Sequence, residues 1–84
     1  MSVNLNSVET KPVISESISN GTFAAIIACA RAYEGDKVPG WNGCHDGQEW
    51  TPEQLKIIAD SLEQTASAVP ILRELAENGG LKIS

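Results

Sequence analysis

The feature that most restricts how this chain can fold is an uninterrupted apolar stretch, FAAIIACA, at residues 23–30. It lies inside a helical segment that begins at Ser19 or Asn20, both good N-cap residues. The segment ends at Gly35, a residue type common at helix C-caps. A helix that is apolar on every side has to be buried on every side. This helix is therefore expected to be covered all round.

A second subunit is one source of that cover. The sequence predicts only two other helices, and both are amphipathic, so one side of the apolar helix is left for the terminal segments or for another copy. Leaving apolar surface in water costs about 25 cal/mol per Å². Four alanines would let another backbone approach closely: Ala24, Ala25, Ala28 and Ala30. We therefore expect a homodimer or higher homo-oligomer with this helix at or near the interface.

The clearest helix start in the chain is at Thr51. Thr51 and Gln54 have the spacing of a capping box, and Pro52 occupies the first helical position. Trp50 before the cap and Leu55 inside the helix fit a hydrophobic staple, which would fix the direction of the preceding loop. The expected apolar face of this helix consists of Leu55, Ile58, Ala59, Leu62 and Ala66.

A third helical pattern follows and leaves two arrangements open. Either Ser67 caps a separate helix with Pro70 in its first turn, or the second helix continues and kinks at Pro70. Residues 78–80, Asn-Gly-Gly, end the pattern.

The terminal segments contain short strand patterns. Residues 1–12 are expected to be flexible or to form an edge strand, because Val3 and Leu5 alternate with asparagines. Residues 13–19 alternate without one clean apolar face, and residues 81–84 end the chain as a short strand. We expect a mainly α fold, a compact three-helix domain over residues 13–84, to which the terminal segments could add a small two-stranded sheet.

Composition excludes several classes of partner. The net charge is −5, and the basic residues are scattered, which argues against nucleic-acid binding and against a polybasic membrane patch. No segment reaches the length of about 18 apolar residues that a membrane span needs. The residues before the apolar stretch lack the positive charge of a signal peptide, which favours a cytoplasmic location.

The stretch GWNGCHDGQEW at residues 40–50 is the main candidate for function. Cys44, His45 and Asp46 could each bind a metal, but three adjacent residues do not have the paired spacing of a structural zinc site. A Cys44–His45 nucleophile is also conceivable, although a working pair usually comes from separate elements. The glycines and Trp41 could instead receive a nucleotide, without any phosphate-loop signature.

We predict a division of roles within this loop. Trp50 is expected to hold the loop rigidly. Trp41 is expected either to fold back over the core or to contact a partner, because no helix start requires it. The predicted binding residues, for a protein partner or a small ligand, are Trp41, Asn42, Cys44 and His45. No cofactor is expected, and the two thiols are expected to be unbridged, with Cys29 buried and Cys44 accessible.

Two stretches resemble known small domains: ISNGTFAAIIACA at 18–30 and PGWNGCHDGQEWTPEQLKIIADSLE at 39–63. The first is similar to the opening of uncharacterised bacterial and phage domains in which a Ser-Asn pair leads into an alanine-rich helix. The resemblance implies a small prokaryotic or viral protein and supplies no catalytic residues. We expect a non-enzymatic interaction protein. The alternative is a module that binds a small nucleotide-like ligand, and the third hypothesis is a small Cys/His enzyme.

Overall fold

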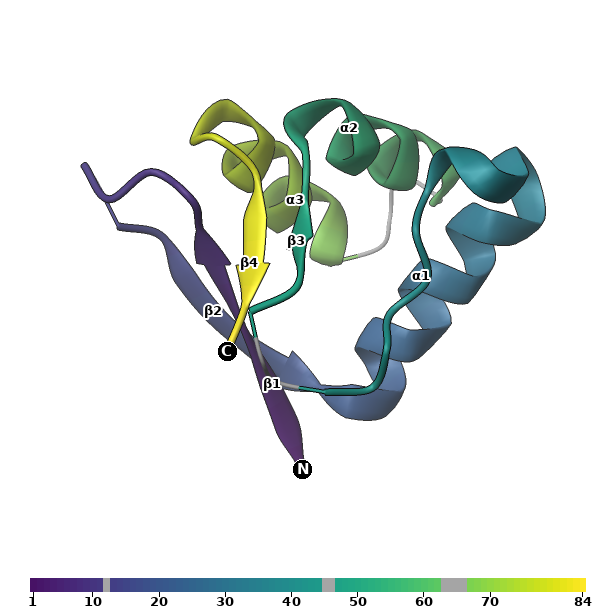
Figure 1. Ribbon diagram of the computed structural model, residues 1–84, viewed down its shortest axis with the longest axis horizontal. Helices are drawn as coiled ribbons and strands as arrows, with labels where there is room; N and C mark the ends of the chain where they lie inside the picture. The colour runs from purple at the N-terminus through teal and green to yellow at the C-terminus, as the bar shows by residue number, and fades with distance from the viewer. Residues whose placement is uncertain (12, 45–46, 63–66) are drawn as a thin grey trace.

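A four-stranded antiparallel sheet and three helices make up the computed structural model, which describes residues 1–11, 13–44, 47–62 and 67–84 (Figure 1). The strands are β1 (Ser2–Ser7), β2 (Ser15–Ser19), β3 (Glu49–Trp50) and β4 (Leu81–Ile83). The helices are α1 (Asn20–Glu34), α2 (Pro52–Ser61) and α3 (Ala68–Glu77), and a 3-10 turn at Gly35–Lys37 follows α1. The strand order is β2-β1-β4-β3.

The prediction of a mainly α three-helix domain with at most a two-stranded sheet is therefore wrong, and the fold is α+β. The sheet was underestimated because β2 is rich in serine and lies at the sheet edge, so it carries no apolar alternation. In contrast, β1 alternates as expected, with Val3, Leu5 and Ser7 buried and Asn4 exposed. β1 lies between β2 and β4, and β4 brings the C-terminal residues beside the N-terminal ones.

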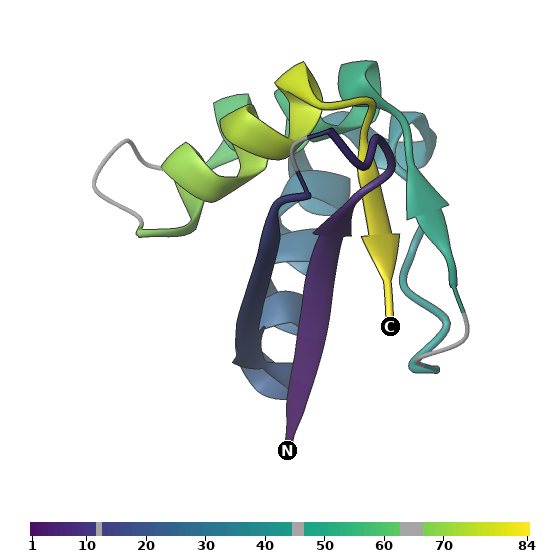
Figure 2. The ribbon, with the colours of Figure 1, turned by 90° about the vertical axis from the view of Figure 1, so that its left-hand side faces the viewer.

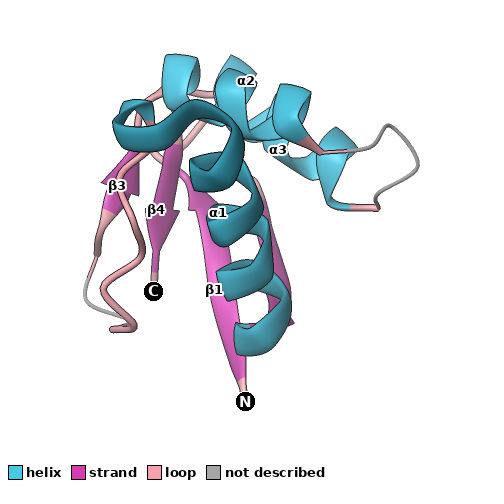
Figure 3. Cartoon of the chain, turned by 90° about the vertical axis from the view of Figure 1, so that its right-hand side faces the viewer, coloured by secondary structure: helices cyan, strands magenta, loops and turns pink. Residues whose placement is uncertain are grey.

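Helix α1 has the predicted limits. The Ser19 hydroxyl accepts a hydrogen bond from the Thr22 backbone N–H, and Gly35, at a φ of 63°, forms the C-cap. Phe23, Ile26, Ile27 and Ala30 of α1 are buried. α1 runs along the sheet beside β1, whereas α2 and α3 lie across the sheet's end (Figure 3).

One chain does not bury α1 on all sides. The side opposite Phe23 and Ile27 remains exposed, because neither the sheet nor α2 reaches it. The exposed small residues on this side are Gly21, Ala24, Ala25, Ala28 and Ala32.

Helix α2 confirms the predicted start. The Thr51 hydroxyl accepts from the Gln54 N–H, and the Gln54 side chain accepts from the Thr51 N–H at 2.8 Å. α2 ends at Ser61 and α3 is a separate helix with Pro70 in its first turn. Ser67 precedes α3 but makes no side-chain cap hydrogen bond. The expected apolar position Ala66 lies outside the described residues.

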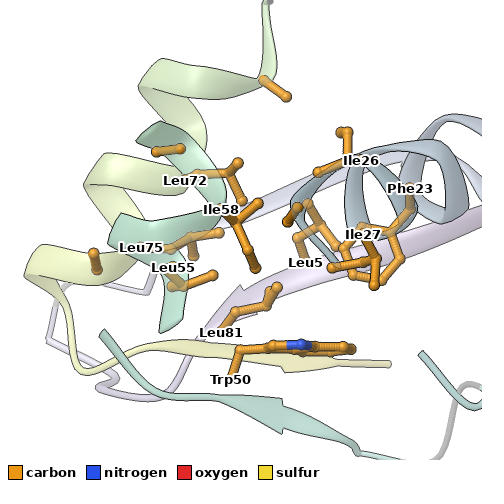
Figure 4. Packing of buried hydrophobic residues seen from close by; sticks show 14 of the residues in the cluster. Leu5, Phe23, Ile26, Ile27, Trp50, Leu55, Ile58, Leu72, Leu75 and Leu81 are labelled. Carbon is orange, nitrogen blue, oxygen red and sulfur yellow. The ribbon is translucent and has the colours of Figure 1, made fainter. Parts of the chain in front are cut away.

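The core lies between the sheet and the three helices. Trp50 of β3 is 1% exposed, and its indole lies below Phe23 and Ile27 of α1 (Figure 4). Leu55 and Ile58 of α2 complete this side of the core, and each is fully buried. The burial of Trp50 and Leu55 agrees with the staple predicted around the Thr51 cap.

Candidate functional site

The first residues of the loop between the 3-10 turn and β3 are hydrogen-bonded to side chains of α1 and β3. Val38 is fully buried, and its carbonyl oxygen accepts a hydrogen bond from Nη1 of Arg31 at 2.7 Å. The next carbonyl, that of Pro39, accepts from Nε1 of Trp50 at 3.0 Å. A helix side chain and a strand side chain therefore fix two consecutive residues of this loop. Trp50 holds the loop, as predicted.

Gln48 connects the two arms of the loop. Its Nε2 donates to the Gly40 carbonyl at 2.9 Å, and its Oε1 accepts from the Asn42 N–H at 3.1 Å. Gln48 lies within the candidate stretch 40–50 but was not among the predicted binding residues, because no motif marks it and its position next to β3 is decided by tertiary structure.

Trp41 folds back over the core and also keeps an exposed part. Its ring packs against Phe23 with centroids 5.1 Å apart and an interplanar angle of 73°. Phe23 makes a second edge contact with Trp50, at 5.4 Å and 87°. Nε1 of Trp41 donates to the Cys44 carbonyl at 3.0 Å. Of the two alternatives left open by sequence, contact with the core holds, and the ring stays half-buried.

The other predicted binding residues differ in what the structure places around them. Asn42 is exposed, and its Oδ1 accepts from the Cys44 N–H at 2.8 Å, which tightens the loop tip. Cys44 is exposed. The fourth predicted binding residue, His45, lies outside the described residues, as does Asp46.

The two cysteines are free thiols, as predicted. Cys44 is exposed, but Cys29 is only half-buried, with its Sγ 3.8 Å from the Ser61 carbonyl oxygen. Cys29 lies on the flank of α1 that faces the end of α2, which explains why it is less buried than its apolar neighbours suggested.

An open hollow lies between Trp41 and the exposed side of α1. It has a volume of about 220 Å³ and is lined by Ala24, Ile27, Ala28, Arg31, Gly40 and Trp41. Alanines leave the space for it, and the Arg31 side chain forms one wall beside Gly40. The sequence pointed to Gly40 and Trp41, which lie within the candidate stretch 40–50, but not to Arg31, which is ten residues before Trp41 in the chain and meets it only after folding.

The hollow continues into the exposed side of α1. Gly21, Ala25, Ala28 and Ala32 follow one another at intervals of four, three and four residues, so they form a single line along the helix. We call this line the α1 seam. Ala28 belongs to both the seam and the hollow.

No protein-family model, curated protein or solved structure matches this chain. Within the described residues, no three Cys, His, Asp or Glu side chains are placed to hold a metal ion. None of the helices in the described ranges has the length and apolar character needed to cross a bilayer.

Proposed function

We propose that this protein is a non-enzymatic interaction protein that self-associates through the α1 seam and the adjoining Trp41 hollow. The observation that carries the proposal is the exposure of Ala25 and Ala28 in the middle of a helix whose opposite side forms the core. Single exposed alanines need no explanation, but a continuous line of small residues at heptad-like spacing is what two helices need to pack closely.

A second copy of α1 is the occupant that this surface favours. Small residues on both helices allow their axes to approach to about 8 Å. A two-fold arrangement with antiparallel helices would set Gly21 against Ala32 of the second copy, and Ala25 against its Ala28. The same surface then serves both subunits, as closed dimers require.

The alternative, a nucleotide-like ligand in the hollow, is supported by Trp41 and by the guanidinium of Arg31. Size weighs against it. Pockets for drug-sized ligands occupy about 300–1,000 Å³ and enclose most of the ligand, whereas this hollow measures about 220 Å³ and is open. A hollow of this size suits one side chain of a partner better than a base with its sugar and phosphate.

Sedimentation velocity over a range of protein concentrations tests the proposal. The wild-type chain should associate, and Ala28→Glu should shift it to monomer, because two carboxylates would face the seam. Since Ala28 is exposed, the monomer of this variant should stay folded, with its stability changed by only about 0.5 kcal/mol. The matched control is Tyr33→Glu, which places the same charge on an exposed residue of α1 away from the seam.

The outcomes separate the two functions. A monomeric wild-type chain at high concentration would refute self-association. Retention of a small molecule after purification, detected by native mass spectrometry and abolished by Arg31→Ala, would favour the ligand-binding alternative instead.

A further inference from the structure

The free edge of the sheet at β2 has backbone groups arranged to accept another strand. β2 is the outermost strand and, within the described ranges, pairs only with β1 (Figure 2). The Ser7 N–H donates to Ile14 O at 2.8 Å, and the Asn20 N–H donates to Met1 O at 3.1 Å. In both bonds, the residue on the β2 side has an even number, Ile14 in the first and Asn20 in the second.

Alternation along the strand assigns the remaining groups. In an antiparallel ladder, backbone groups of successive residues point to opposite sides. Glu16 and Ile18 therefore point their N–H and C=O groups toward β1. The N–H and C=O groups of Ser15 and Ser17 point away from the sheet. The pairing of β1 with β4 supports this assignment. Asn4, the cross-strand neighbour of Ser17, exchanges both backbone hydrogen bonds with Ser84, so neither Asn4 nor Ser17 uses its backbone groups between β1 and β2.

Exposed edges are usually blunted by lysine, proline, a bulge or a charge on the core-facing side of the strand. Of these devices, β2 has only the last, at Glu16. The strand SESIS contains neither lysine nor proline, and it pairs with β1 in unbroken register. Ser15 and Ser17 are exposed and small, so an incoming backbone could approach closely.

One charged residue distinguishes this edge. Glu16 is the cross-strand partner of buried Leu5, so its side chain is on the same face of the sheet as the core. It is itself exposed, and none of the ion pairs among the described residues includes it. Half-buried Ile14 and Ile18 flank it on that face and pack against the core.

We propose that the β2 edge binds an extended peptide segment whose alternate residues are apolar, basic and apolar. The peptide backbone would pair with Ser15 and Ser17, which is the usual mode of strand addition. Its basic residue would lie beside Glu16 and its two apolar residues beside Ile14 and Ile18. Opposite charges at neighbouring positions of paired strands are favourable.

The same carboxylate disfavours a second copy of this chain at the edge. An antiparallel self-pairing that uses both Ser15 and Ser17 sets Glu16 directly against Glu16 of the other copy. Like charges at such positions are destabilising. Glu16 therefore selects a basic partner and rejects the chain's own strand, which is how specificity commonly arises. This site is separate from the α1 seam and does not depend on the proposed self-association.

An NMR titration with synthetic peptides tests the proposal on the full chain. The probe is the acetylated and amidated peptide Thr-Val-Thr-Arg-Thr-Val-Thr, and the control peptide has Glu in place of Arg. The amide signals of residues 15 and 17 should shift with the Arg peptide. Its affinity should exceed that of the Glu peptide by about tenfold, the difference between an attractive and a repulsive cross-strand pair. In Glu16→Arg the preference of the two peptides should reverse.

Ser17→Pro isolates the backbone contribution. Its N–H faces away from β1, so proline removes the outward donor while leaving the β1 ladder intact. Ser17→Pro should abolish binding, and Ser17→Ala, which keeps the donor, should bind like wild type. If Ser17→Pro fails to fold, the charge reversal in Glu16→Arg still decides the question.

Three results would overturn the proposal. The first is an absence of binding by either peptide, and the second is equal affinity for both. The third is loss of the wild-type oligomer in folded Ser17→Pro, because that would assign the edge to a second copy.

Discussion

Gly80 shows how a single residue can fix the junction of two elements. It joins α3 to β4 at a φ of 113°, and a Cβ placed on it would lie 2.5 Å from the Trp50 carbonyl oxygen. The close approach brings β4 beside β3 and so closes the sheet over the core. Gly43 also has a positive φ, 80°, but a Cβ there would meet nothing within 4 Å.

This contrast predicts different costs for the same substitution. Gly43→Ala should lower the free energy of unfolding by about 1 kcal/mol, the cost of a left-handed backbone for a residue with a Cβ. Gly80→Ala should lower it by about 3 kcal/mol or more, because a backbone clash adds to that cost. Urea denaturation of both variants measures the difference. Equal losses would show that the Trp50 carbonyl moves aside easily.

Substitutions of the two tryptophans should likewise differ in their effect on the free energy of unfolding. Trp50→Ala removes a fully buried ring and its hydrogen bond to Pro39, at a cost of about 3–5 kcal/mol. Trp41 is only half-buried, so Trp41→Ala should cost about 1–2 kcal/mol, chiefly from its edge contact with Phe23. Trp41→Ala should also weaken self-association, which sedimentation would detect. If Trp41→Ala costs as much stability as Trp50→Ala, Trp41 acts only as a core residue.

The helices differ in how their starts are stabilised, although both α2 and α3 follow a hydroxyl residue. Thr51 and Gln54 satisfy each other's backbone N–H groups at the start of α2. Ser67 makes no such bond at the start of α3, whose position is set by its buried residues Leu72 and Leu75. A local cap therefore defines α2, and packing defines α3.

Alanine substitutions at these two positions form a matched pair. Thr51→Ala should lower the free energy of unfolding by about 1 kcal/mol, since the Gln54 N–H loses its acceptor. Ser67→Ala should leave it unchanged within about 0.5 kcal/mol. Thermal and chemical unfolding of both variants would test this. A loss in Ser67→Ala equal to that in Thr51→Ala would contradict the assignment.

At the scale of the whole molecule, stability and association should be linked. A chain that dimerises in its folded state gains stability as its concentration rises, because the unfolded chain does not bind. The midpoint of thermal unfolding should therefore rise with concentration for the wild type and stay constant for Ala28→Glu. Scanning calorimetry at several concentrations measures it. A constant midpoint in the wild type would mean that the α1 seam stays in water.

How far the sequence could predict the fold depended on whether the relevant signals were local. The start of α2, the limits of α1 and the strand at 81–83 could be predicted because capping residues and alternation act within a few positions. The four-stranded sheet could not, because β1 pairs with β4 across the length of the chain and the serines of β2 carry no apolar pattern. For the same reason, Trp41 was identified as a candidate site residue, whereas Arg31, ten residues earlier in the chain, was not.

The sequence by itself determined which segments become helices and that Trp50 anchors the loop before α2. Only the tertiary structure decided which side of α1 is covered, since a stretch that is apolar all round does not indicate which residues face the sheet. Burial went to Phe23, Ile26 and Ile27, whose large side chains gain most from leaving water. Ala30 is buried with them, but Ala24, Ala25, Ala28 and Ala32 were left outside, where their small size loses least and where a second helix could approach most closely.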